Sequence, residues 1–133
     1  MTERLRIGLG ADLHRLADGR TCILGGVEIE SRVGPSGHSD ADALFHALTD
    51  ALLGAAGLPD LGSLFPDSDA EWKDKPSRHF VEEAMHRLDG MQLAPHSVDI
   101  VVQCDQPRIG PHRDEIRRSI AALLRLPPDR VNV

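Results

Sequence analysis

Apolar and polar residues alternate from Leu5 to Leu9, and this period of two predicts a strand. Short runs of β-branched and aliphatic residues predict further strands, at residues 22–24, 27–29, 98–103 and 130–133. The pair Gly25–Gly26, which separates two of these runs, indicates a turn or a bulge. These segments are the strands of a predicted β-sheet.

Apolar residues recur at helical spacing in three segments and predict helices, at residues 39–56, 77–88 and 112–126. Gly57 and Pro59 predict the end of the first helix. Residues 33–37 and 59–76 have the Pro, Gly, Ser and Asp content of loops, and a loop as long as the second is often functional. Together these elements predict an α+β fold, a two-layer mixed β-sheet with three helices packed on one face, in a single domain of residues 1–133.

Composition narrows the class of ligand. The chain has 41% hydrophobic but only 3% aromatic residues, so we expect an aliphatic core. A net charge of −6 argues against non-specific nucleic-acid binding, which needs a basic face. If the ligand is a phosphate ester, a cation must stand between its charge and these acidic groups. A domain of this size also gains from oligomerisation, because it buries a small fraction of its own surface.

Cys22 and Cys104 are far apart and form no CxxC pair, which excludes a cysteine zinc site and a disulfide framework. The N-terminal residues lack the apolar core of a signal peptide. No apolar run approaches the roughly 20 residues that a membrane span needs. We therefore expect a cytoplasmic protein with no membrane partner.

Asp12 and His14 are candidate metal ligands, because residues two apart in an extended chain point to the same side. On the predicted helix 39–56, His46 lies away from the stripe of Leu44 and Leu48, on a polar face with Asp42 and Asp50. One carboxylate and two imidazoles suit zinc with its fourth position open. Either of the two helix carboxylates is placed to accept the free ring N–H of His46. An isolated histidine on a polar helix face is more often simply solvated, and spacing alone does not join the three residues.

His38, Ser39 and Asp40 lie at the predicted N-terminus of that helix. Ser39 or Asp40 is expected to cap the helix, while free N–H groups and His38 face an anion. In the acidic loop, Asp60, Asp67 and Asp69 have the composition of a solvated segment, yet the large apolar Phe65 indicates that the loop packs over something.

Taken together, these segments resemble the 2-C-methyl-D-erythritol 2,4-cyclodiphosphate synthase family. RIGLGADLHRL is similar to its N-terminal strand with the Asp-x-His pair, and QPRIGPH to its nucleotide-contacting turn. The most specific similarity is the block GHSDADALFHALTDALLGAAGLPDLGSLFPDSD. The resemblance covers essentially the whole chain and implies a bacterial enzyme.

The resemblance assigns roles to individual residues. Asp12, His14 and His46 match zinc ligands, and His38 matches a catalytic residue that holds the diphosphate and stabilises the transition state. The positions that match substrate contacts are Asp12, His14, His38, Ser39, Asp60, Leu61, Gly62, Phe65, Pro66, Asp67, Ser68, Asp69, Cys104, Asp105, Gln106, Pro107, Arg108, Ile109 and Gly110.

The implied reaction converts 4-diphosphocytidyl-2-C-methyl-D-erythritol 2-phosphate to the 2,4-cyclodiphosphate and CMP, in non-mevalonate isoprenoid synthesis. Implied cofactors are one Zn²⁺ per chain and a second divalent cation, Mg²⁺ or Mn²⁺. Implied partners are the cytidine diphosphate substrate, two further copies in a homotrimer with active sites between subunits, and an isoprenoid diphosphate in its central cavity.

The sequence also departs from the family pattern. Ala11 replaces an aromatic residue, Pro59 a glycine, and Asp105–Gln106 alters the nucleotide turn. The resemblance further implies a Thr-rich loop, an acidic metal ligand, a strand and a helix beyond Val133, and we expect these to be missing from this chain. Two alternatives stay open: another metal-dependent hydrolase or phosphotransferase, and a non-enzymatic trimer that binds isoprenoid diphosphates.

Overall fold

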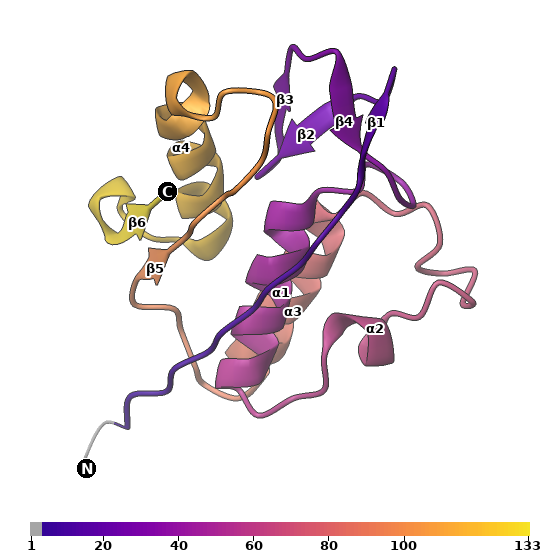
Figure 1. Cartoon of the computed structure of the whole chain (residues 1–133). Coiled ribbons are helices and arrows are strands. Elements are labelled where there is room, and N and C mark those ends of the chain that lie inside the picture. The colour runs from indigo at the N-terminus through magenta and orange to yellow at the C-terminus, as the bar shows by residue number, and fades with distance from the viewer. Residues whose placement is uncertain (1–3) are drawn as a thin grey trace.

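The computed structural model describes residues 4–133 and combines helices with short strands (Figure 1). The helices are α1 (Ala43–Ala55), α2 (Leu61–Leu64), α3 (Arg78–Gly90) and α4 (Arg113–Leu124). The strands are β1 (Leu16–Asp18), β2 (Cys22–Leu24), β3 (Val27–Ile29), β4 (Val33–Pro35), β5 (Val98–Asp99) and β6 (Val131–Asn132). The predicted α+β class is confirmed.

The strands pair as two antiparallel ribbons, β1 with β4 and β2 with β3, and one parallel pair, β5 with β6. The predicted turn at Gly25–Gly26 is confirmed, and both glycines have the positive φ that favours this residue. The prediction of a single mixed sheet is wrong, because the strands of residues 4–133 form three separate two-stranded sheets. Strand β4 also lies where the sequence predicted a loop.

The N-terminal segment is extended but has no strand partner among the described residues, so the strand predicted at Leu5–Leu9 is wrong. It runs directly over α1 (Figure 1). A Cβ atom on Gly8 would lie 1.8 Å from the carbonyl oxygen of Ala51, so only glycine allows this approach. Side chains do alternate between two sides of this segment. The side that faces α1 carries Gly8 and Gly10, and the apolar residues Leu5, Ile7 and Leu9 on the other side are about nine-tenths exposed.

The segment predicted as a strand at residues 98–103 is a strand only at Val98–Asp99. Ile100 still donates its N–H to the carbonyl of Asn132, but the following residues have no strand partner among those described. A cavity of about 990 Å³ separates residues 100–107 from residues 10–14. The two segments face each other across this cavity and do not pair as strands.

Helix α1 begins four residues later than residue 39, where the sequence predicted it. Ser39 and Ala41 have φ values of 55° and 49°, which cannot belong to a right-handed helix. Asp42 is the N-cap and accepts the N–H of Phe45. The expected capping role of Ser39 or Asp40 therefore belongs to Asp42.

The core lies between α1 and α3 and extends to α4 and the β2–β3 hairpin. Its largest buried side chains include Phe45, Phe65, Leu53, Ile116 and Ile120. The helices predicted at residues 77–88 and 112–126 are confirmed to within a few residues at each end. No helix within residues 4–133 combines the length and apolar character needed to cross a membrane.

Candidate active site

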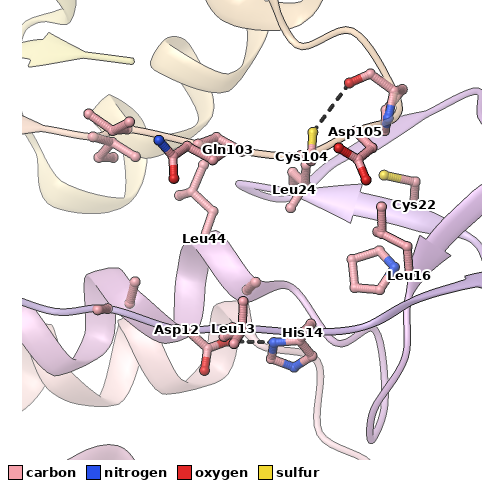
Figure 2. A pocket seen from close by; sticks show the side chains of 18 of the residues that line it. Asp12, Leu13, His14, Leu16, Cys22, Leu24, Leu44, Gln103, Cys104 and Asp105 are labelled. Atoms are coloured by element: carbon pink, nitrogen blue, oxygen red, sulfur yellow. Dashed lines mark hydrogen bonds and ion pairs between the residues drawn. The ribbon is translucent and has the colours of Figure 1, made fainter.

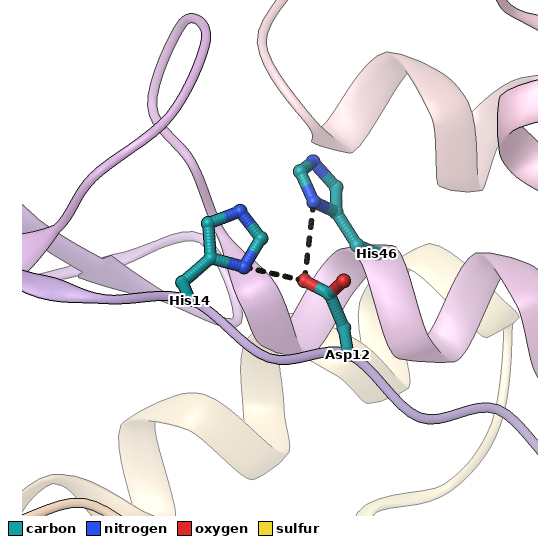
Figure 3. A group of neighbouring side chains, drawn as sticks. All are labelled: Asp12, His14 and His46. Carbon is teal, nitrogen blue, oxygen red and sulfur yellow. Dashed lines mark ion pairs between the residues drawn. The ribbon is translucent and has the colours of Figure 1, made fainter.

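Asp12, His14 and His46 come together as one cluster beside α1 (Figure 3). Each offers one ligand atom, and these atoms lie within 4.8 Å of one another. The Oδ2 atom of Asp12 lies 2.7 Å from Nδ1 of His14 and 3.4 Å from Nδ1 of His46. The sequence predicted both the ligand pair and the helix histidine, and the structure joins them.

Two local features bring these side chains together. The extended N-terminal segment crosses α1 closely, because a Cβ atom on Gly10 would lie 1.8 Å from the carbonyl oxygen of Ala47, the residue after His46. Asp12 and His14 are two residues apart in this extended chain and so reach the same side. Gly37 packs closely against the His14 ring, since a Cβ atom there would lie 3.2 Å from Cδ2 of His14.

The cluster is equipped to bind a cation. Nδ1 of His14 is buried and has no hydrogen-bond partner among residues 4–133, although Asp12 lies beside it. Burial lowers the pKa of His46, against the nearby Asp12 carboxylate, which raises it. Neutral imidazoles with free lone pairs, together with one carboxylate, are the donor set of a catalytic zinc site with an open position. The residues present therefore fit a divalent metal ion.

The second nitrogen of His46 is held by Ser77, whose Oγ lies 2.8 Å from Nε2. The sequence predicted Asp42 or Asp50 for this role, and both predictions are wrong. Asp50 accepts the N–H of Leu61 instead. Ser77 was missed because it is 31 positions from His46 and nothing in their spacing joins them.

Asp42 clamps α1 to the β2–β3 turn. Its side chain is fully buried, and its two oxygens accept the N–H groups of Gly25 and Gly26, at 2.9 and 2.7 Å. Burial raises the pKa of this carboxyl to about 6, against the N–H donors of Phe45 and the two glycines, which lower it. The carboxylate thus fixes the start of the helix that carries His46.

A small pocket of about 220 Å³ adjoins the cluster and contains His38 and Ser39. Nε2 of His38 lies 3.5 Å from Oδ2 of Asp67, and both side chains are largely exposed. His14 and His46 line the same pocket. An imidazole and a hydroxyl thus lie beside the cluster of Asp12, His14 and His46, and their role in holding phosphate stays a prediction. Trp72 and Lys75 also line this pocket, and no pattern in the sequence predicted them.

The acidic loop is only partly turned toward this pocket. Leu61 and Asp67 line it, whereas Asp60 caps α2 by accepting the N–H of Ser63. Hydrogen bonding from Ser63, by its side chain first and by its N–H second, lowers the pKa of Asp60. Phe65 is 1% exposed and packs against Trp72 and Phe80 in an aromatic cluster, which confirms that the loop packs over a core. Its side chain lies behind Trp72 and Phe80 and is not among those that line the pocket. The sequence also predicted substrate contacts at four further residues of this loop. These do not line the pocket: Gly62, Pro66, Ser68 and Asp69.

The predicted nucleotide segment lies on the other side of the metal-binding cluster. Cys104, Asp105, Gln106 and Pro107 line the large cavity, together with Asp12 and His14 (Figure 2). Arg108, Ile109 and Gly110 are not among the lining residues. His14 lines both hollows, so the cluster stands at their junction. Burial raises the pKa of the Cys104 thiol, which argues against a thiolate nucleophile there.

Comparison with known proteins identifies this arrangement. The sequence profile of the YgbB family matches residues 5–133. The 2-C-methyl-D-erythritol 2,4-cyclodiphosphate synthase of Salinibacter ruber is 50% identical over 129 residues, which are 97% of this chain and 82% of that protein. The chain belongs to the YgbB family of cyclodiphosphate synthases.

Other YgbB relatives agree in sequence and in structure. The synthase of Aquifex aeolicus is 46% identical, over 97% of this chain and 83% of that protein. A solved 2C-methyl-D-erythritol-2,4-cyclodiphosphate synthase in its CDP-bound form superposes with a TM-score of 0.92 at 46% identity. That match covers 96% of this chain and 85% of the solved one. The short paired strands and helices described above thus have the arrangement of a YgbB domain.

Proposed function

We propose that this chain converts 4-diphosphocytidyl-2-C-methyl-D-erythritol 2-phosphate to 2-C-methyl-D-erythritol 2,4-cyclodiphosphate and CMP. The observation that carries this function is the meeting of Asp12, His14 and His46 beside a pocket that contains His38, in a chain 50% identical to such a synthase. Its place is the non-mevalonate route of isoprenoid synthesis, as for the YgbB relatives.

The reaction is an intramolecular phosphoryl transfer. An oxygen of the 2-phosphate forms a bond to the β-phosphorus, and the bond from that phosphorus to the oxygen of the α-phosphate breaks. The electron pair leaves with CMP. No protein nucleophile is required, so the protein holds the two phosphates in line and neutralises their charge.

Asp12, His14 and His46 hold Zn²⁺ in this proposal, through one carboxylate oxygen and two ring nitrogens. When bound there, Zn²⁺ would supply Lewis-acid polarisation of a phosphoryl oxygen. A second divalent cation, Mg²⁺ or Mn²⁺, would help to neutralise the phosphate charge. This resolves the charge conflict between an acidic protein and an anionic substrate.

His38 is the catalytic residue of the proposal: its ring lies in the small pocket, where it would donate a hydrogen bond to developing phosphoryl charge. Ser39 contacts phosphate beside it. The erythritol moiety lies against Asp60, Leu61 and Gly62, and against the loop from Phe65 through Pro66, Asp67 and Ser68 to Asp69. Phe65 contributes through its backbone, since its side chain is buried.

The nucleotide is bound by the segment from Cys104 to Gly110. In a single chain this segment is separated from His38 by the metal-binding cluster, so we propose that a neighbouring subunit brings the two halves of a site together. A homotrimer is supported by apolar side chains that are more than 80% exposed, those of Leu5, Ile7, Leu9, Leu13 and Val101. An isoprenoid diphosphate in the central cavity of that trimer remains a further part of the proposal.

The test is an assay of purified protein with the diphosphocytidyl substrate, zinc and magnesium. Chromatography measures the CMP that is released. We expect CMP and the cyclodiphosphate in equal amounts. Comparable turnover of other nucleoside diphosphate esters would favour a general phosphotransferase. Folded, metal-loaded protein that releases no CMP would contradict the proposed activity.

A further inference from the structure

The two ring nitrogens of His46 have different neighbours. Nδ1 lies 3.4 Å from Oδ2 of Asp12, inside the metal-binding cluster. Nε2 points away from Asp12, as Figure 3 shows, and lies 2.8 Å from Oγ of Ser77. A metal ion binds a ring nitrogen through its free lone pair. If Nδ1 binds the ion, the ring proton of neutral His46 must therefore be on Nε2, which faces Ser77.

Ser77 stands at the N-cap of α3 but does not act as a cap. Serine is favoured at this position because its oxygen accepts an N–H of the first turn, yet Ser77 makes no such bond. Its side chain is 1% exposed and faces His46 and Asp40 instead. Ser77 thus makes no capping hydrogen bond to α3 and instead contacts His46 on α1.

Asp40 fixes the direction of the hydroxyl. Its Oδ1 lies 2.5 Å from Oγ of Ser77, and its Oδ2 accepts the backbone N–H of Ser77 at 3.1 Å. A carboxylate only accepts hydrogen bonds, so the Ser77 O–H donates to Asp40. The Ser77 oxygen then has only lone pairs to offer His46, which must donate its Nε2–H. A neutral His46 in this tautomer carries the free lone pair on Nδ1.

We propose that Ser77 and Asp40 are positioning residues that lock His46 in its Nε2–H tautomer and aim Nδ1 at the bound ion. The inference concerns the metal site of the proposed function and adds a relay from Asp40 through Ser77 to that ligand. Partners of this kind orient metal-bound histidines and raise their basicity. The relay also joins the start of α3 to the cluster beside α1.

The experiment combines the tautomer with zinc affinity in four proteins. Nitrogen-15 NMR of the histidine rings reports the tautomer of His46 in metal-free protein, and competition with a chelator gives the zinc Kd. The variants are Ser77→Ala, Ser77→Thr, which retains the hydroxyl, and Ser119→Ala. Ser119 is the matched control, because its hydroxyl donates to the carbonyl of Gly25, on another element than the cluster.

We expect wild type, Ser77→Thr and Ser119→Ala to show His46 protonated at Nε2. In Ser77→Ala we expect a mixture of tautomers and zinc binding weakened about 10–100-fold. A single Nε2–H tautomer and an unchanged Kd in folded Ser77→Ala would overturn the proposal. If that variant does not fold, Asp40→Ala decides by the same readouts, because it removes the acceptor that orients the hydroxyl.

The outcomes separate this inference from the proposed function. Wild type that binds zinc while Ser77→Ala behaves identically contradicts the relay and leaves the metal site standing. Wild type that binds no zinc contradicts the metal site, while the tautomer in metal-free protein still decides whether Ser77 sets the state of His46.

Discussion

Oγ of Ser77 lies 2.8 Å from Nε2 of His46 and joins the N-cap residue of α3 to a candidate metal ligand on α1. This contact leaves Nδ1 of His46 facing Asp12. The candidate site is therefore held from two sides, by the N-terminal segment that carries Asp12 and by the start of α3. Substitutions at the two sides should have separable effects.

Replacing His38 tests chemistry without disturbing the metal. Because the His38 side chain is exposed and belongs to the pocket rather than the cluster, we expect His38→Ala to retain zinc and its fold. Loss of one hydrogen-bond donor to transition-state charge should lower kcat about 10²–10³-fold. Steady-state kinetics with a metal assay on the same sample check this. An unchanged kcat would remove His38 from the catalytic role.

Asp42→Ala tests the clamp at the start of α1. The substitution leaves the buried N–H groups of Gly25, Gly26 and Phe45 without their acceptor. We expect the free energy of unfolding at pH 5 to fall by about 2–4 kcal/mol. Urea denaturation measures the loss, and Asp69→Ala, on an exposed loop side chain, serves as the control. Equal stability of both variants would mean that the clamp contributes nothing.

The same residue gives a pH dependence. Burial raises the pKa of Asp42 from 3.8 to about 6 in the folded protein. Between these values the unfolded chain releases the proton and the folded chain keeps it, so stability falls as the pH rises toward 6. The difference between wild type and Asp42→Ala should shrink by about 1.4 kcal/mol per pH unit in this range. A difference that stays constant or grows with pH would contradict the assignment.

Self-association is tested on the exposed apolar segment. A homotrimer should sediment at three times the chain mass of 14.5 kDa. Ile7, which is 92% exposed in the single chain, is the position to change. We expect Ile7→Lys to shift the population toward monomer and to lower activity at dilute protein concentration. A wild type that sediments as a monomer at all concentrations would contradict the trimer.

The sequence predicted Asp12, His14 and His46 as ligands of one ion; the structure brings their side chains together, and ion binding stays a prediction. The spacing of Asp12 and His14 and the polar helix face of His46 follow from backbone geometry alone, and the family resemblance joined them. The role of Asp42 was missed because it depends on a hairpin turn 16 and 17 residues away. Ser77 was missed for the same reason. The alternation at Leu5–Leu9 predicted an extended chain correctly, but pairing depends on a neighbour that no alternation specifies.

The most direct test of the central claim is the metal content of purified protein, with wild type measured beside His46→Ala and Ser119→Ala. If Asp12, His14 and His46 form one catalytic site, wild type and Ser119→Ala carry one zinc ion per chain and His46→Ala carries almost none. Folded wild type without zinc, or His46→Ala with a full complement of it, would contradict the claim that these three residues bind the ion.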